Sequence, residues 1–130
     1  MMRYLCSLGS NIQPEKHFRE VKQRLASLSS SIRYSRAIQT QPVDIDTSKQ
    51  FLNALFIIES ALPEAALKQS FNQIEILMGR DRSDPLSSQK DRPIDIDILG
   101  IITSEAAFPD VPDYLHSLTA DLMPPQGVTS

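Results

Sequence analysis

Residues 31–60 read SIRYSRAIQTQPVDIDTSKQFLNALFIIES, and this stretch decides the class of fold. In its first ten residues, Ile32, Tyr34 and Ile38 predict a strand with these three side chains on one alternating face. The last ten residues are almost continuously apolar and predict a more deeply buried strand. The connection at about residues 41–50 is polar and long for a hairpin. Two neighbouring strands without a helix between them argue against a doubly wound parallel sheet.

A strand and a helix are predicted on each side of this pair. Residues 3–9, RYLCSLG, predict a strand that ends in a turn at Gly9, and residues 14–28 carry apolar side chains at helical spacing. Residues 63–79 repeat the helical pattern, and residues 92–102 predict the last strand. The order predicts an α+β, ferredoxin-like split βαβ fold (βαββαβ), a four-stranded antiparallel sheet with both helices packed on it. The apolar stripes are Phe18, Val21, Leu25 and Leu28 in the first helix and Leu67, Phe71, Ile74 and Met78 in the second.

The size and charge of the chain limit what it can do. Its 130 residues suit one domain, expected over residues 1–118 with a frayed tail at 119–130. The 13 basic and 16 acidic residues create no overall positive field that would attract nucleic acid or an anionic membrane. The chain lacks an apolar stretch of membrane-spanning length and a secretion signal, so a cytoplasmic protein is expected. The single cysteine, Cys6, is expected to pack in the core.

Two aspartates alternate with isoleucines in RPIDIDIL, residues 92–99. On a strand, Asp95 and Asp97 share one face and lie roughly 7 Å apart at Cα. From that separation two carboxylates can jointly hold Mg²⁺ in a phosphoryl-transfer site. Alternating charges are also what a solvated sheet face shows. Leu99 and Ile101 are expected to continue the aspartate face, which makes a plain water-facing stripe the weaker interpretation.

A charged stretch, RDRSDPLSSQKD at residues 80–91, precedes this strand and has no apolar period, which predicts a loop. Its arginines could close over a triphosphate, because a guanidinium fork grips phosphate oxygens two at a time. Its aspartates nearly cancel the positive charge, so an ordinary solvated loop is the alternative. The cations are Arg80, Arg82, Lys90 and the adjoining Arg92, and the aspartates are Asp81, Asp84 and Asp91.

Three other features give weaker signals. SLGSN, residues 7–11, lies between a strand and a helix, where main-chain amides can bind an anion, but a structural turn is the simpler interpretation. Asn72 and Glu75 lie off the apolar stripe of the second helix, which favours solvated helix surface. His17 and His116 each lack a second ligand at metal spacing.

Several separated stretches together resemble the hydroxymethyldihydropterin pyrophosphokinases, enzymes of folate biosynthesis. They are SLGSN, QTQPV, FLNA, IEILMGRDR and RPIDIDIL, in matching order and approximate spacing over about residues 3–101. The combination of GRxR, a loop and RxxDxDIL is the most specific part. The resemblance implies a ferredoxin-like fold and transfer of the terminal pyrophosphate of ATP to the hydroxymethyl oxygen of a reduced pterin, with release of AMP.

The same resemblance implies roles for individual residues. Asp95 and Asp97 correspond to ligands of two Mg²⁺ ions, and Arg80 and Arg92 correspond to loop arginines that assist transfer. The positions implied on the nucleotide side are Asn72, Glu75, Arg82 and Ile98. The positions implied on the pterin side are Asn11, Thr40, Pro42, Val43, Phe51 and Asn53.

The pterin half of the family pattern is better preserved than the nucleotide half. Phe51 matches an aromatic that stacks on the flat ring, and Asn53 matches a side chain that reads the polar edge of the ring. By contrast, Gln89 stands where the family has a tryptophan over the nucleotide, and Asp113 stands where a histidine is expected. A carboxylate near phosphates weakens nucleotide binding unless a metal or a partner compensates.

Two functions of different classes follow from these patterns. The first is a Mg²⁺-dependent pterin pyrophosphokinase whose partners are small molecules, a reduced pterin and ATP. The second is a noncatalytic or regulatory relative that binds a pterin, or a partner protein, with a degenerate ATP site. An RNA-binding module on the same fold is disfavoured, because the net charge is −3 and the basic, aromatic strand motif is missing. The oligomeric state stays open.

Overall fold

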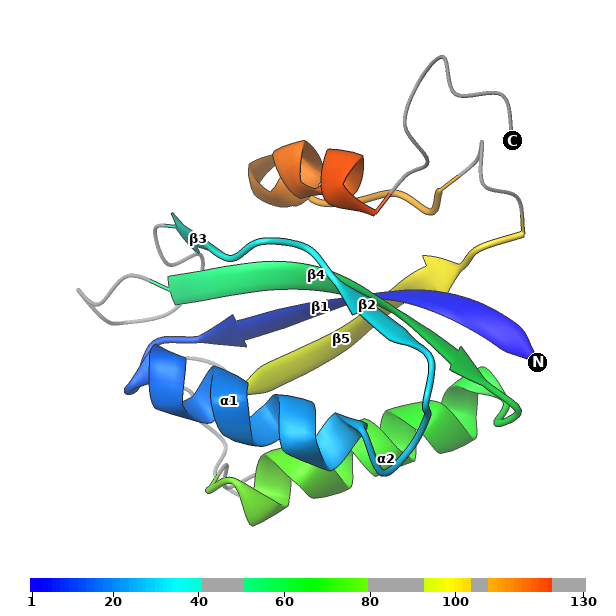
Figure 1. The fold of residues 1–130 in the computed structure, drawn as a ribbon, viewed down its shortest axis with the longest axis horizontal. Helices are drawn as coiled ribbons and strands as arrows, with labels where there is room; N and C mark the ends of the chain where they lie inside the picture. The colour runs from blue at the N-terminus through cyan, green and yellow to red at the C-terminus, as the bar shows by residue number, and fades with distance from the viewer. Residues whose placement is uncertain (41–50, 80–92, 104–107, 123–130) are drawn as a thin grey trace.

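The computed structural model describes residues 1–40, 51–79, 93–103 and 108–122. These residues form an α+β fold with an antiparallel five-stranded sheet, two α-helices and one 3-10 helix (Figure 1). The strands are β1 (Met2–Ser10), β2 (Ile32–Tyr34), β3 (Ile38–Thr40), β4 (Phe51–Ser60) and β5 (Asp95–Ile101). The helices are α1 (Pro14–Leu25), α2 (Glu64–Leu77) and the 3-10 helix η1 (Asp113–Asp121).

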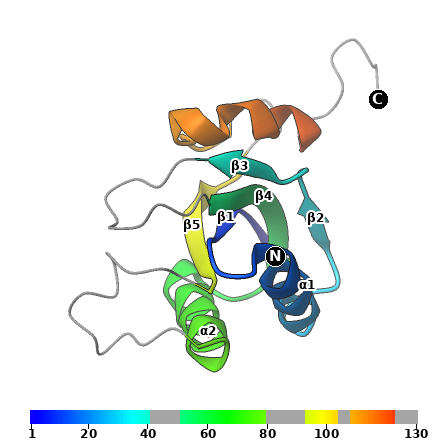
Figure 2. The same cartoon turned by 90° about the vertical axis from the view of Figure 1, so that its left-hand side faces the viewer.

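The strands lie in the order β2-β4-β1-β5, and β3 also pairs with β4. The two α-helices cover one face of the sheet, and η1 lies over the opposite face (Figure 2). The expected ferredoxin-like arrangement is confirmed. The sheet has five strands in place of the four expected, because the strand predicted within residues 31–40 is divided into β2 and β3. No helix in the described part of the chain is long and apolar enough to cross a membrane.

The larger of two hydrophobic clusters lies between the sheet and the α-helices, and we term it the helix-side cluster. The helical stripes predicted from spacing point into it. The ring of Phe56 occupies its middle, with its centroid 5.7 Å from that of Tyr34 and 6.0 Å from that of Phe71. Cys6 is fully buried here, which confirms the expected core position. Each fully buried apolar side chain contributes about 1.5–3 kcal/mol, so this layer is a main source of stability.

A second cluster lies on the other face of the sheet, and we term it the η1-side cluster. It consists of Leu5, Leu55, Ile57, Ile102, Leu115, Leu118 and Leu122. The leucines of η1 cover the middle of β1 and β4, so both faces of these strands are buried. The helix ends at Asp121, past the domain boundary expected at residue 118, and residues 123–130 lie outside the described residues.

One of the three side chains expected to share a face in the first predicted strand lies on the other side. Ile32 and Tyr34 pack against the helix-side cluster, whereas Ile38 packs against the η1-side cluster. Tyr34 lies opposite Phe56 and Ile38 lies opposite Asn53, so the first strand holds one more residue than β4 between these points. One added residue reverses the face of every side chain that follows it.

A second irregularity occurs where β5 pairs with β1. Leu99 packs against the η1-side cluster, but Ile101 packs against the helix-side cluster. The expectation that both residues continue the aspartate face is right for Leu99 and wrong for Ile101. Gly100 lies between them, and a Cβ atom there would be 2.7 Å from Cβ of Pro109. The segment before η1 therefore packs directly on the main chain of β5.

Candidate functional site

Polar residues predicted for the site lie in one row across the sheet, on the face opposite to the α-helices. Asp95 of β5 and Asn53 of β4 both pair with Gly9 of β1, which lies between them. Ile38 of β3 pairs with Asn53 and ends the row. We term these four residues the Gly9 row. Because two strand spacings separate Asp95 from Asn53, their Cα atoms are about 10 Å apart.

Gly9 leaves no space for a side chain at the centre of the row. A Cβ atom there would be 2.9 Å from Oδ1 of Asn53 and 3.6 Å from Cδ1 of Phe51. The side chains of Asn53 and Phe51 therefore lean over β1 from β4, and they are only 7% and 8% exposed. At the centre of the row, Gly9 thus has the Asn53 amide and the Phe51 ring leaning over it from β4, and Asp95 as its neighbour on β5.

Thr40 of β3 orients the amide of Asn53. Nδ2 of Asn53 donates a hydrogen bond to Oγ1 of Thr40. This bond holds the donor side of the amide toward β3, while the acceptor Oδ1 lies over Gly9. Asn11 is a second buried amide that directly follows β1 at the same end of the sheet. Four of the residues predicted on the pterin side, Thr40, Phe51, Asn53 and Asn11, thus belong to this end of the sheet.

Asp95 and Asp97 lie on one face of β5, as the alternation predicts. Asp95 is half-buried, whereas Asp97 is exposed and pairs with Ser7 in the next row. Mg²⁺ prefers carboxylate oxygens and keeps its other positions for water and phosphate, so this pair fits a magnesium site. Among the described residues, no group of three or more His, Cys, Asp and Glu side chains gathers as metal ligands. The described chain thus offers two carboxylates on this face of β5.

Glu75 is fully buried, so its expected place on solvated helix surface is wrong. Its Oε2 atom accepts a 2.8 Å hydrogen bond from the main-chain N–H of Ile96, the residue between Asp95 and Asp97. This bond ties the outer edge of β5 to α2. The spacing contained the signal, because Glu75 follows the buried Phe71 by one helical turn and shares its side of the helix.

Two other residues predicted on the nucleotide side lie within the described residues. Asn72 is half-buried on α2. Ile98 packs against the helix-side cluster, so its side chain lies on the other face of β5 from Asp97. The predicted site residues outside the described ranges are Pro42, Val43, Arg80, Arg82 and Arg92, together with the altered position Gln89.

Cys6, His17 and His116 lie outside the Gly9 row. Burial raises the pKa of the Cys6 thiol and so favours its protonated form. Nδ1 of His17 lies 2.5 Å from the main-chain oxygen of Ile12, just before α1. His116 is exposed on η1.

The fold and the Gly9 row, with Asp97 and Phe51 beside it, define an α+β protein whose ferredoxin-like sheet presents two carboxylates, an amide and an aromatic ring on one face. Residues 5–120 match the family model described as 7,8-dihydro-6-hydroxymethylpterin-pyrophosphokinase (HPPK). The chain belongs to the HPPK family. A search of the curated proteins finds no match. Family membership supports a general function as a pterin pyrophosphokinase in folate biosynthesis.

Proposed function

We propose that this protein transfers the terminal pyrophosphate of ATP to the hydroxymethyl group of 6-hydroxymethyl-7,8-dihydropterin and releases AMP, in a Mg²⁺-dependent reaction. The observation that carries the proposal is the Gly9 row, in which Asp95 and Asn53 flank one glycine on a single face. A pterin lying across the row directs its hydroxymethyl group toward the carboxylates while its ring lies against Phe51. Membership of the HPPK family over residues 5–120 supports the same reaction.

The β4 side of the row suits a pterin because the ring is planar and carries donors and acceptors along its edge. Phe51 offers an aromatic face, and Asn53 offers an amide whose acceptor oxygen lies over Gly9. Thr40 limits the rotation of that amide through its hydrogen bond. A fixed amide loses less conformational entropy on binding than a mobile one. Asn11, Pro42 and Val43 complete the proposed pterin subsite.

Asp95 and Asp97 are proposed to hold two Mg²⁺ ions beside the phosphates of ATP. Bound Mg²⁺ neutralises charge on phosphate oxygens and helps to align the reacting groups. In the transfer, the hydroxymethyl oxygen forms a bond to the β-phosphorus of ATP and loses its proton. The bond from that phosphorus to the oxygen bridging the α-phosphate breaks, and AMP leaves with the bridging oxygen.

The nucleotide side is proposed to depend on the arginines near β5 and on residues that fix this strand. Arg80 and Arg92 would neutralise charge that develops on the transferred group. Glu75 contributes by holding the main chain of Ile96, and so the strand that carries the aspartates. The other proposed nucleotide-side residues are Asn72, Arg82 and Ile98.

AMP release from MgATP, measured with and without 6-hydroxymethyl-7,8-dihydropterin, tests the proposal. We expect release that requires the pterin and is lost in Asp97→Asn. Asp110→Asn is the matched control, because Asp110 is an exposed aspartate outside the Gly9 row. AMP release that does not depend on the pterin, or that is unchanged in Asp97→Asn, contradicts the proposed reaction.

A pterin-binding relative without efficient transfer is the second candidate function. Asp113 favours it, because this exposed carboxylate begins η1 where the family pattern has a histidine. A calorimetric titration of the pterin alone separates the candidates. Pterin binding without AMP release supports the noncatalytic relative, whereas pterin-dependent AMP release supports the enzyme.

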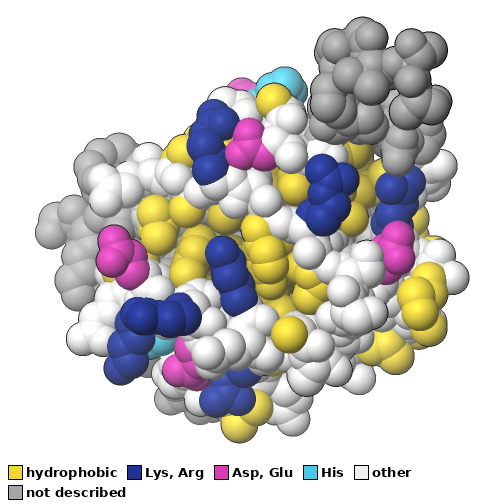
Figure 3. Space-filling view, viewed as in Figure 1, with side chains coloured by type: hydrophobic (Ala, Val, Ile, Leu, Met, Phe, Trp, Pro, Cys, Tyr) yellow, Lys and Arg dark blue, Asp and Glu magenta, His cyan; other side chains and the backbone are white. Residues whose placement is uncertain are grey.

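The proposed partners are small molecules, without nucleic acid or membrane. The net charge is −3, and on the face shown in Figure 3 the Lys and Arg side chains are interspersed with Asp and Glu. A surface of mixed charge lacks the positive electrostatic field that attracts nucleic acid. Cys6 is a buried free thiol, which agrees with the proposed cytoplasmic location.

A further inference from the structure

The break between β2 and β3 is a β-bulge. Tyr34 pairs with Phe56 before the break, and Ile38 pairs with Asn53 after it. Residues 35–37 therefore lie opposite only two residues of β4. A bulge of this kind adds one residue to a strand and reverses the faces that the following side chains occupy.

The bulge determines which residue of β3 faces the proposed pterin subsite. Thr40 lies opposite Phe51 and accepts a hydrogen bond from the Asn53 amide. If the pairing of β2 continued without the bulge, Gln39 would lie opposite Phe51 in its place. Paired residues share a face, so Thr40 would then lie on the helix side of the sheet. The contact between Thr40 and Asn53 therefore exists because of the bulge.

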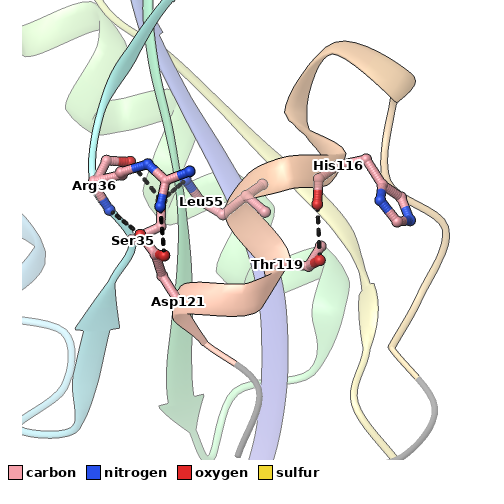
Figure 4. Close-up of polar contacts among 6 residues, drawn as sticks. All are labelled: Ser35, Arg36, Leu55, His116, Thr119 and Asp121. Carbon is pink, nitrogen blue, oxygen red and sulfur yellow. Dashed lines mark hydrogen bonds and ion pairs between the residues drawn. The ribbon is translucent and has the colours of Figure 1, made fainter. Parts of the chain in front are cut away.

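Ser35 holds the bulge from within the sheet (Figure 4). Its main-chain N–H donates a 2.9 Å hydrogen bond to the oxygen of Leu55. Its Oγ accepts a 2.8 Å bond from the N–H of Leu55 and donates a 2.8 Å bond to the oxygen of Arg36. In a regular ladder a main-chain oxygen accepts the N–H of the partner strand. Here the side chain of Ser35, which is 7% exposed, takes that role.

Asp121 holds the bulge from the end of η1 (Figure 4). Its Oδ2 accepts a 2.8 Å hydrogen bond from the main-chain N–H of Arg36, and its Oδ1 accepts a 2.9 Å bond from Nη1 of the same residue. The carboxylate thus satisfies an N–H group in the bulge and binds the guanidinium beside it. Hydrogen bonds to a charged group are stronger than those between neutral groups.

We propose that Ser35 and Asp121 are positioning residues for the pterin subsite, because they hold the bulge that turns Thr40 toward Asn53. The inference rests on the proposed function for the identity of the ligand. The geometry itself rests on the strand pairing and on the five hydrogen bonds that join Ser35, Arg36, Leu55 and Asp121. Ser35 bonds to Leu55 and Asp121 bonds to Arg36, and these partners lie outside the row, so each is proposed to act through β3.

Ser35→Ala is the first test, because it removes the acceptor of the Leu55 N–H group. We expect the pterin Kd to rise about tenfold, and the Kd of MgATP to change by about twofold or less. Ser35→Thr keeps the hydroxyl group and is expected to restore pterin binding. Amide hydrogen exchange at Leu55 should be faster in Ser35→Ala and normal in Ser35→Thr.

Asp121→Asn is the second test, and it does not disturb a buried residue. It is expected to weaken pterin binding in the same direction as Ser35→Ala, with MgATP binding unchanged. Glu20→Gln is the matched control, because it removes a carboxylate from the 3.0 Å pair with Arg24 on α1, outside the sheet. If Ser35→Ala fails to fold, Asp121→Asn and Ser35→Thr still decide the outcome.

Methyl NMR of Ile38 separates this inference from the proposed function. In the wild type, Ile38 should show cross-peaks to leucines of the η1-side cluster, and Ser35→Ala should lose them. If the wild-type protein binds no pterin, the proposed function is overturned. Loss of the Ile38 cross-peaks in Ser35→Ala would still support the positioning of β3 by Ser35. Unchanged cross-peaks in Ser35→Ala overturn the inference, and so do lost cross-peaks with an unchanged pterin Kd.

Discussion

The carboxylate of Glu75 accepts a hydrogen bond from the main-chain N–H of Ile96, at a distance of 2.8 Å. Ile96 lies between the two aspartates of β5, a strand whose other edge pairs with β1. The bond satisfies an N–H group that an outer strand would otherwise present to solvent or to another chain. The strand that carries the aspartates is therefore attached to the rest of the protein along both of its edges.

Replacing Glu75 by leucine should destabilise the protein and lower pterin-dependent AMP release. The N–H of Ile96 then loses its acceptor in a buried position, which costs about 1–3 kcal/mol in the free energy of unfolding. Glu75→Gln keeps an acceptor oxygen and should retain more of both stability and activity. Urea unfolding and AMP release measure the two effects. Equal stability of the leucine variant and the wild type would show that the bond contributes nothing.

Gly9→Ala should weaken pterin binding, because the new methyl group would meet Oδ1 of Asn53 at 2.9 Å. The amide must shift, and overpacking of this kind costs about 1–3 kcal/mol. Gly100→Ala is the matched control, since it forces a similar contact with Pro109 at a position that pairs with Leu5 and lies outside the row. We expect both variants to lose stability in urea and only Gly9→Ala to lose pterin affinity in a calorimetric titration.

Phe51→Leu should weaken pterin binding more than MgATP binding. Leucine keeps the position apolar but removes the aromatic face, a loss of up to about tenfold in affinity. Phe108→Leu makes the same chemical change beside the η1-side cluster and should leave the pterin Kd unchanged. Equal losses for pterin and MgATP in Phe51→Leu would argue against stacking on this ring.

Asp95→Ala and Asp97→Ala should abolish Mg²⁺-dependent AMP release while leaving the fold intact. Asp97 is exposed, so its replacement is expected to change the free energy of unfolding by about 0.5 kcal/mol or less. Removal of Mg²⁺ with a chelator should stop the wild-type reaction, and added Mg²⁺ should restore it. A sharp fall in melting temperature in both variants would instead mean that the carboxylates support the structure.

Stability should fall in alkaline solution, partly because of Tyr34. Burial raises the pKa of Tyr34 from 10.0 to about 12, so the folded protein keeps this proton when the unfolded chain loses it. The contribution of Tyr34 is therefore complete below its unfolded pKa and is lost as the pH rises through the folded value. Tyr34→Phe should flatten the fall between those two pKa values in urea unfolding at a series of pH values. The same slope in both proteins would contradict this assignment.

Much of the fold was predictable because the sequence repeats a pattern in each element. Phe18, Val21 and Leu25 recur at helical spacing and are buried, and Asp95 and Asp97 alternate with isoleucines and share a face. These signals are local, since each depends on residues a few positions apart. The order of the elements then favoured a ferredoxin-like fold over a doubly wound sheet.

The bulge at β3 was not predictable from alternation. The added residue has no characteristic sequence. Ile38 follows Tyr34 by an even number of residues, so alternation places both side chains on one face. Its cause lies in the hydrogen bonds of Ser35 and in Asp121, which is distant in the sequence. The face of Thr40 therefore depends on a contact that no short stretch contains.

The helix over the second face has a signal in the sequence. Leu115, Leu118 and Leu122 recur at three and four residues and are all buried. Glu75 likewise lies at helical spacing from a buried aromatic. Prolines flank the three leucines, and Glu75 is charged, so neither looks like part of a buried helical stripe.

The central place of β1 has a consequence for how the chain acquires its activity during synthesis. β1 is the first strand in the sequence, yet it lies between β4 and β5, and Gly9 needs both Asn53 and Asp95 as neighbours. Pairing between such distant segments is slow, because a long loop must close before the contact forms. A nascent chain that has completed β4 already holds the proposed pterin residues of β3 and β4. The proposed transfer therefore has to wait until the ribosome has released β5, because Asp95 and Asp97 lie on that strand.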